Sequence, residues 1–211
     1  MWCTVSIKFG SLLLLLFACP KIVCTKGDTQ ATAPCKIRKV TPQDCDALIN
    51  LYKSVSAVPG GLARTPPEIT PGYIDNLITR GIENGLFLVA ITDNRIVGAM
   101  IKYKPNVECV RHILYEGSIL VEPPYQGRGI GTQLITSFLE TIKLSRRDVL
   151  RVELVVRESN TKAIALYEKL GFEKEGHFKH RIFNHLGNFE DDIPMTWINP
   201  AFSATSKKEK K

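Results

Sequence analysis

Residues 118–139 read SILVEPPYQGRGIGTQLITSFL. A short apolar run ends at two prolines, a turn with three glycines follows, and apolar residues then recur at helical spacing from Leu134 onward. The pattern predicts a strand that passes through a glycine-rich turn into a helix. Because the first turn of a helix has unpartnered N–H groups and a positive dipole end, this turn suits an anion such as a pyrophosphate. An ordinary glycine-containing turn between two core elements is the alternative.

The spacing of the glycines argues against two other phosphate-binding motifs. A dinucleotide fingerprint requires G-x-G-x-x-G, whereas Gly127, Gly129 and Gly131 form G-x-G-x-G. A phosphate-binding loop requires a lysine before its Ser or Thr, whereas Gly131 is followed directly by Thr132. The turn is therefore predicted to be an anion site of another kind.

Composition indicates a globular domain that is close to neutral. The chain has 211 residues, of which 44% are apolar and 23% charged, as in soluble globular proteins. Its formal net charge is +7, but residues 1–24 hold two lysines and residues 207–211 carry a net +3, which leaves +2 for residues 25–206. A domain so nearly neutral gives no electrostatic reason to expect nucleic-acid binding.

The first 24 residues are similar to a secretory signal peptide. Lys8 precedes the apolar segment 11–19, which is shorter than the roughly 20 residues of a membrane-spanning helix but fits a signal-peptide core. We expect export, or membrane anchoring through this leader if it is uncleaved or lipidated; a cytoplasmic protein with an over-extended start is the alternative. The remaining boundaries are predicted as a linker at 25–34, a folded domain at 35–199 and a disordered basic tail at 200–211.

Cysteine and histidine placement predicts no metal site. Three cysteines lie in the leader, and the other three are scattered without a C-x-x-C pair. The histidines show no ligand spacing with cysteines or acids; they are His112, His177, His180 and His185.

Hydrophobic periodicity and turn residues predict alternating strands and helices. Strands are predicted at 36–40, 86–92, 96–103, 111–121, 150–157, 172–181 and 189–198. Helices are predicted from Pro42 to before Pro59, from Pro71 to before Gly85, at 129–143, and from Asn160 to before Gly171. The strand–helix–strand unit from 114 to 157 should be a right-handed crossover with parallel strands. The last two strands should form an antiparallel pair.

A second motif follows the turn. Gln126, Gly129 and Gly131 fit Q/R-x-x-G-x-G/A, and residues 160–172 fit N-x-x-A-x-x-L-Y-x-x-x-G-F at every fixed position. Asn160 and Tyr167 are two helical turns apart, so they share a face at about 10 Å separation. With these two motifs the chain resembles the GNAT superfamily of N-acetyltransferases, most strongly over 116–172 and more broadly over 35–198. The resemblance implies an α/β (α+β) fold, with a mixed central sheet of about six to seven strands flanked by about four helices.

The resemblance also implies that acetyl-CoA is the cosubstrate and assigns roles to both motifs. Backbone groups of the strand would pair with the pantetheine arm, namely those of Ile119, Leu120 and Val121. The turn and the start of the helix would hold the pyrophosphate, through Gln126, Gly127, Arg128, Gly129, Ile130, Gly131 and Thr132. Asn160 would contact the CoA arm, and Tyr167 would protonate the departing thiolate. A phenol pKa of about 10, above a thiol pKa of about 8.5, keeps Tyr167 protonated at neutral pH; a packed aromatic ring is the alternative role.

The base that deprotonates the amine is less defined. Glu116 lies on the strand that leads to the turn, and Glu153 lies on the strand before Asn160. Related enzymes that acetylate protein N-termini often have a glutamate five residues before this asparagine, where the chain has Val155. Glu116, Glu153, water and another group all remain candidates, and either glutamate could simply be solvated or ion-paired.

The expected activity is direct transfer of an acetyl group from acetyl-CoA to a primary amine. A small-molecule amine or amino acid is favoured over a protein N-terminus or lysine. Segments 58–67 and 183–189 are expected to select the acceptor, with Arg64, His185 and Asn188 as polar contacts. The alternative is a non-catalytic acyl-CoA-binding module or a secreted interaction protein, which the leader suggests because acetyl-CoA is scarce outside the cytoplasm.

Overall fold

The computed structural model describes residues 35–184 and 186–203. The predicted leader, the linker, residues 204–211 of the predicted tail and His185 lie outside the described residues. Within the described ranges, no helix combines the length and the apolar character that crossing a bilayer requires.

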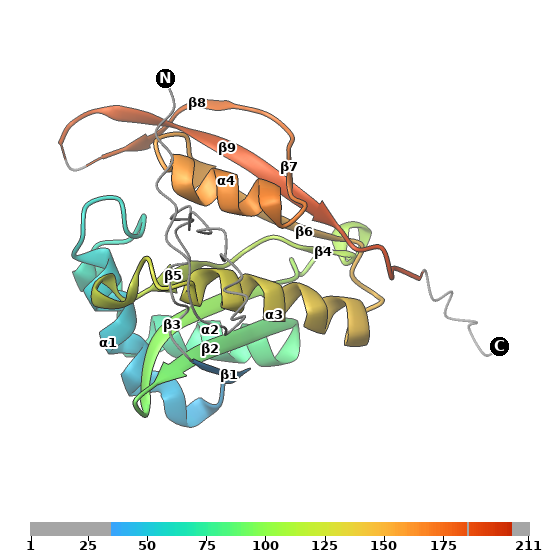
Figure 1. Ribbon diagram of the computed structural model, residues 1–211, viewed down its shortest axis with the longest axis horizontal. Coiled ribbons are helices and arrows are strands. Elements are labelled where there is room, and N and C mark those ends of the chain that lie inside the picture. Colours follow the sequence, from blue (N-terminus) through green and yellow to red (C-terminus); the bar gives the residue numbers. More distant parts are fainter. Residues whose placement is uncertain (1–34, 185, 204–211) are drawn as a thin grey trace, which may run out of the picture.

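The described chain alternates between strands and helices (Figure 1). The helices are α1 (Cys45–Ser56), α2 (Pro71–Glu83), α3 (Ile130–Ser145) and α4 (Thr161–Lys169). The strands are β1 (Lys36–Lys39), β2 (Gly85–Thr92), β3 (Arg95–Tyr103), β4 (Ile113–Leu114), β5 (Ile119–Val121), β6 (Arg151–Arg157), β7 (Glu173–Lys174), β8 (Phe178–Phe183) and β9 (Phe189–Ile198). The predicted α/β class and the four α-helices are confirmed for this part of the chain.

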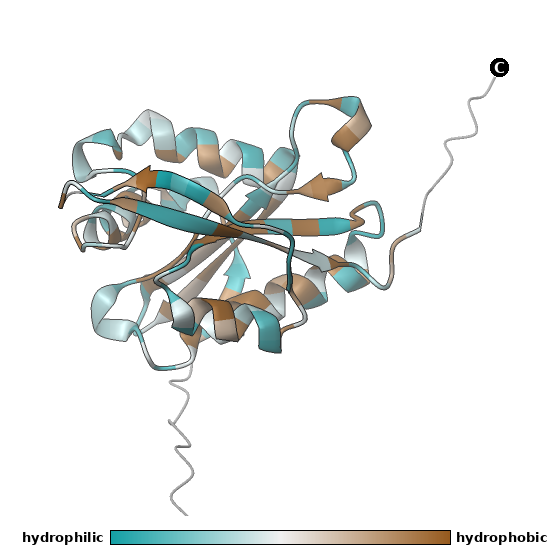
Figure 2. Ribbon diagram, turned by 90° about the horizontal axis from the view of Figure 1, so that it is seen from above, coloured by the Kyte–Doolittle hydropathy of each residue, from teal (hydrophilic) through white to brown (hydrophobic). Residues whose placement is uncertain are grey.

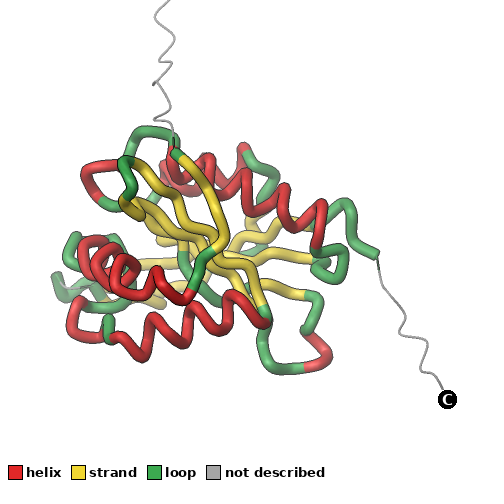
Figure 3. The backbone as a smooth tube through the Cα atoms, turned by 90° about the horizontal axis from the view of Figure 1, so that it is seen from below, coloured by secondary structure: helices red, strands yellow, loops and turns green. Residues whose placement is uncertain are grey.

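Helices cover both faces of the sheet that contains β2 and β3 (Figure 3). Successive side chains of a strand point to opposite faces. Leu86 and Leu88 of β2 accordingly belong to the core under α3, whereas Phe87 and Val89 belong to the core under α1 and α2. Both faces are buried, so β2 is an unbroken apolar run rather than an alternating one, as the hydropathy colours of the central strands show (Figure 2).

The strands form two sheets. One has the order β1-β2-β3-β5, and all its neighbours are antiparallel. The other has the order β4-β6-β9-β7, with β8 also paired to β9. Within it β4 and β6 are parallel, with Ile113 opposite Arg151. The predicted parallel strand–helix–strand unit is therefore confirmed for β4, α3 and β6.

The prediction of one strand at 111–121 is wrong, because the chain changes sheets inside this segment. β4 pairs with β6 and β5 pairs with β3. The chain already pairs with β3 at Glu116, whose carbonyl accepts from the N–H of Tyr103, so the change of sheet falls between Leu114 and Glu116. Gly117 follows the change with a φ of +129°, and a Cβ there would be 2.1 Å from the carbonyl oxygen of Ile101. Since no side chain fits that space, only glycine lets the chain lie this close to β3 directly after the change.

The strand predicted at 172–181 is also divided, into β7 and β8. The register of β8 against β9 shifts between Phe178 and Ile182, and His180 in between has a φ of +53°. An irregularity of this kind adds local twist and ends regular pairing. The predicted antiparallel pair survives as β8 and β9.

Replacing Gly117 tests the close contact between this segment and β3. We expect Gly117→Ala to lower the free energy of unfolding by at least about 2 kcal/mol, because the new methyl group meets the Ile101 carbonyl at an unfavourable φ. Gly72→Ala in the first turn of α2 is the control: nothing lies within 4 Å of the new Cβ, so stability should rise by about 0.5–1 kcal/mol. Urea unfolding midpoints measure both, and equal midpoints for Gly117→Ala and the natural chain would contradict this account.

Candidate functional site

The glycine turn leaves the start of α3 open to a ligand. Gly127 and Gly129 have φ values of +72° and +78°, which favour glycine. The Gln126 side-chain amide donates to the carbonyl of Val121 at 2.9 Å and so ties the turn back to the end of β5. Gly129 is the N-cap residue and has no side chain to cap the helix. The first N–H groups of α3 are therefore available to an anion.

A cavity of about 560 Å³ lies over this turn. We call it the turn cavity. It is lined by β5, by the turn, by the loop after α1 and by α4, through Val55, Val58, Pro59, Gly60, Gly61, Ile119, Leu120, Val121, Tyr125, Gln126, Gly127, Gly129, Ile130, Gly131, Thr132, Ile135, Asn160, Lys162, Ala163, Leu166 and Tyr167. Every residue predicted to hold CoA is among these except Arg128, which stacks instead on the ring of Tyr125 at 5.2 Å.

A second cavity of about 440 Å³ lies on the other side of β5 and α4. We call it the cation-lined cavity. Its charged lining residues are Lys102, Arg64, Arg157, Arg181 and Asp192. The predicted acceptor segment 58–67 contributes Gly60 to Arg64. The described residues of the other predicted segment, 183–189, do not line the cavity. The N–H of Asn188 donates to the side chain of Asn184. Arg181 and Ile182, which precede this segment on β8, line the cavity instead.

The two cavities share the lining residues Gly60, Gly61, Ile119, Asn160 and Tyr167, and only Asn160 and Tyr167 of these have polar side chains. Asn160 caps α4, because its Oδ1 accepts from the N–H of Ala163 at 3.2 Å. Tyr167 is 6% exposed, and its hydroxyl has no hydrogen-bond partner among the described residues. Burial raises the pKa of Tyr167 to about 12, so the phenol keeps its proton at neutral pH. A group at this junction can therefore receive a hydrogen bond or a proton while touching the contents of both cavities.

The two glutamates predicted as bases line neither cavity. Glu116 accepts from the Tyr115 hydroxyl at 2.6 Å and lies 3.9 Å from Arg80. The Tyr115 hydrogen bond, more than the Arg80 charge, holds the pKa of Glu116 below its usual value. Glu153 is ion-paired to Arg151 at 2.7 Å. The geometry thus gives both glutamates local partners instead of a place beside Tyr167.

Val155 faces the cation-lined cavity at the position where the resemblance would place a glutamate. Sequence reasoning missed Lys102 and Asp192, the two buried charged residues of this cavity. The available signal was a charged residue inside an otherwise apolar strand, since Lys102 interrupts the run Ile96–Ile101 and Asp192 precedes the buried end of β9.

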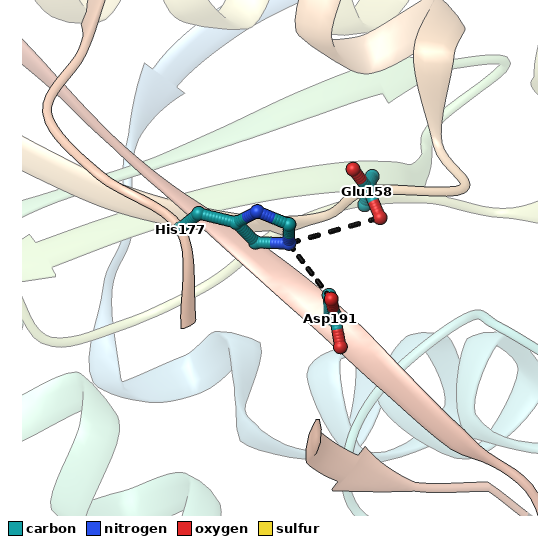
Figure 4. Close-up of side chains that lie close together, drawn as sticks. All are labelled: Glu158, His177 and Asp191. Carbon is teal, nitrogen blue, oxygen red and sulfur yellow. Dashed lines mark hydrogen bonds and ion pairs between the residues drawn. The ribbon is translucent and has the colours of Figure 1, made fainter. Parts of the chain in front are cut away.

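A separate group of side chains has the composition of a metal site (Figure 4). His177 Nε2 lies 2.8 Å from Asp191 Oδ2 and 3.8 Å from Glu158 Oε2. Sequence spacing does not predict this group, because β9 brings Asp191 beside the end of β6, where the Asp191 carbonyl accepts from the N–H of Glu158. An ion pair between a histidine and two carboxylates also accounts for the group, so the absence of a metal stays a prediction.

Comparison with known proteins identifies the family. A family model described as "Acetyltransferase (GNAT) family" matches residues 58–172, which include the glycine turn, Asn160 and Tyr167. The chain belongs to the GNAT family of acetyltransferases. Family membership supports transfer of an acetyl group to an amine as the general reaction, with acetyl-CoA as cosubstrate.

Individual relatives show how far the likeness extends. An N-alpha-acetyltransferase of Saccharolobus solfataricus is 35% identical over 122 residues, which are 52% of this chain and 69% of that protein. An uncharacterized N-acetyltransferase of Methanocaldococcus jannaschii is 31% identical over 141 residues, 66% of this chain but only 61% of that protein. The phosphinothricin acetyltransferase of Sinorhizobium meliloti, solved with acetyl-CoA, has a TM-score of 0.71 at 21% identity and shares the fold over 84% of this GNAT chain and 95% of its own.

An acidic side chain at Gly131 separates cofactor binding from folding. A Cβ at Gly131 meets only Val121 at 3.8 Å, and a carboxylate in the first turn favours a helix. We expect Gly131→Asp to keep or raise the melting temperature but to weaken acetyl-CoA binding at least about tenfold, because the carboxylate repels the pyrophosphate. Isothermal titration measures the affinity, with Gly131→Ala as the uncharged control. Unchanged affinity in Gly131→Asp would place the pyrophosphate elsewhere.

Proposed function

We propose that the protein is an acetyl-CoA-dependent N-acetyltransferase that transfers the acetyl group directly to a primary amine, with both substrates bound at once. The observation that carries this proposal is the meeting of two cavities at Asn160 and Tyr167. Direct transfer is supported because no cysteine lines either cavity in the described chain, and the Ser118 hydroxyl is paired with Tyr52 at 2.8 Å. The two cavities therefore offer no thiol and no free serine hydroxyl for an acyl-enzyme.

The turn cavity suits the CoA half of the reaction. Its pyrophosphate would sit at the start of α3, where backbone N–H groups and the helix dipole favour negative charge. β5 is the edge strand of its sheet, so its outer backbone groups are open to the amides of a pantetheine arm. An arm that follows β5 from the turn toward Ile119 leads the thioester to Tyr167, which lines the same cavity.

The cation-lined cavity suits an amine that also carries a carboxylate. Arg64, Arg157, Arg181 and Lys102 are set against the single acid Asp192. The Arg64 guanidinium stacks on the ring of Tyr73 at 4.4 Å, which holds it in place. Its only ion pair within the described residues is the exposed one with Glu68 at 3.8 Å, which an acceptor carboxylate can replace. We propose an α-amino acid or a similar small molecule as the acceptor. A polyamine would add positive charge to a wall that is already positive.

A peptide with acidic first residues presents the same chemistry, a primary amine close to a carboxylate. Because the chain is similar to an N-alpha-acetyltransferase, such a protein N-terminus is the alternative acceptor. A non-catalytic acyl-CoA-binding module is the alternative of a different class. Export through the leader also remains a proposal, and sequencing the mature N-terminus tests it.

An acceptor panel with release of free CoA thiol as the readout tests the proposed reaction. The arms are L-alanine, L-alanine methyl ester, a peptide that begins with two acidic residues, and spermidine. We expect L-alanine to exceed its ester in kcat/KM by about tenfold or more, because only the free acid presents a carboxylate to the arginines. A higher rate for the acidic peptide would favour the protein N-terminus.

Arg64→Gln should remove most of the preference for the free acid over the ester. Arg80→Gln is the matched control, because Arg80 is similarly exposed and also stacks on a tyrosine but lines neither cavity. A preference for the ester or for spermidine in the natural chain would contradict the proposed acceptor. Acetyl-CoA binding without thiol release on any arm would instead support the non-catalytic module.

A further inference from the structure

The proposed reaction needs a base, and the two predicted glutamates line neither cavity. The attacking nitrogen must lose a proton as its bond to the acetyl carbon forms. Among the groups that line the cation-lined cavity, arginine side chains do not lose protons in proteins and the two tyrosines are weak acids. Lys102 and Asp192 are left as the groups that can take up a proton near neutral pH.

The surroundings of the Lys102 side chain favour its neutral amine form. Its side chain is on β3, the residue is 4% exposed, and it lines the same cavity as Tyr167. Nζ donates to the carbonyl oxygen of Tyr115 at 2.9 Å, and no carboxylate of the described chain lies within ion-pair distance. Lysine is seldom buried without such a partner, because burial penalises its charged form. Burial lowers the pKa of Lys102 to about 8, and the more distant Glu153 raises it slightly in return.

We propose that Lys102, in its neutral form, is the catalytic base that accepts the proton of the attacking amine. This inference rests on the proposed function. The amine lone pair forms the C–N bond, and the N–H proton passes to Nζ of Lys102. Collapse of the tetrahedral intermediate breaks the C–S bond, and the sulfur takes a proton from the hydroxyl of Tyr167. Proton exchange through solvent then returns Lys102 to the amine and Tyr167 to the phenol, so the products are the amide and free CoA.

Asp192 is the competing group and has a different setting. Its carboxylate lies 3.6 Å from the guanidinium of Arg181, and it is paired in register with Arg157. Burial raises the pKa of Asp192, and the charges of Arg181 and Arg157 oppose that rise; Arg157 has its own ion pair with Glu190 at 3.6 Å. We therefore assign Asp192 to positioning Arg181, which lines the same cavity.

The pH dependence follows from the groups around Lys102. Those that face it or share its cavity are Glu153 and Arg157 of β6, Asp192 of β9, Arg181 of β8, Tyr167 of α4, and Arg64 and Tyr73. The pKa of Lys102 is about 8. The base form grows as pH rises through that value, so kcat should rise with pH and level off above it.

The test compares kcat between pH 6 and 10 for the natural chain, Lys102→Met and Lys102→Arg, with the best acceptor of the panel. Methionine keeps the length and apolar character of the stem, and arginine keeps the charge but cannot act as a base. We expect both variants to lose about 100-fold or more in kcat and to lose the rising limb near pH 8. Tyr167→Phe should lower kcat but keep that limb. Melting temperature and acetyl-CoA affinity report whether each variant is folded.

Three results would overturn the inference while leaving the proposed function intact. The first is a Lys102→Met variant whose kcat still rises near pH 8 as in the natural chain. The second is a Lys102→Arg variant that keeps the natural activity. The third is an Asp192→Asn variant that loses the rise of kcat near pH 8. A direct titration adds a readout that needs no turnover: with ¹³C-labelled lysine, the signal missing from Lys102→Met should titrate near pH 8, and titration above pH 10 would refute the assignment. Absence of thiol release by the natural chain with every acceptor would reject the proposed function itself.

Discussion

The site depends on one steric constraint, the contact between Gly117 and the carbonyl of Ile101. No Cβ fits between them, and Gly117 takes a backbone conformation that favours glycine. The chain leaves one sheet at β4 and pairs with β3 from Glu116 on, and Gly117 lets it stay against β3 as it runs into β5. Two features accompany this step. β5 is an edge strand whose backbone can meet a ligand, and the carbonyl of Tyr115 accepts from Lys102.

Two helix N-termini then border the turn cavity, and the two helices share one core. α3 begins with two left-handed glycines and leaves its first N–H groups for an anion. α4 begins with Asn160, which caps its own helix and sets Tyr167 two turns further on at the junction of the cavities. The proposed CoA side of the site is thus made largely of backbone and the proposed acceptor side largely of charged side chains.

The sequence predicted the elements that local pattern controls. The turn at 126–131 and the pair Asn160 and Tyr167 follow from short spacing within one strand–turn–helix or one helix, and the structure places all of them around the turn cavity. The break in 111–121 could not be predicted in the same way, because it depends on pairing with β6 on one side and β3 on the other, which local spacing does not encode. Lys102 was missed for the same reason: its importance lies in what faces it across strands, and no local spacing encodes that.

The proposed reaction requires CoA to lie in the turn cavity with its sulfur at the junction of the two cavities. A crystal structure of the protein with CoA tests this most directly. It should show the pyrophosphate on the N–H groups at the start of α3, the pantetheine arm beside β5, and the sulfur within hydrogen-bond distance of the Tyr167 hydroxyl. Density for CoA outside the turn cavity, or a sulfur remote from Tyr167, would contradict the account.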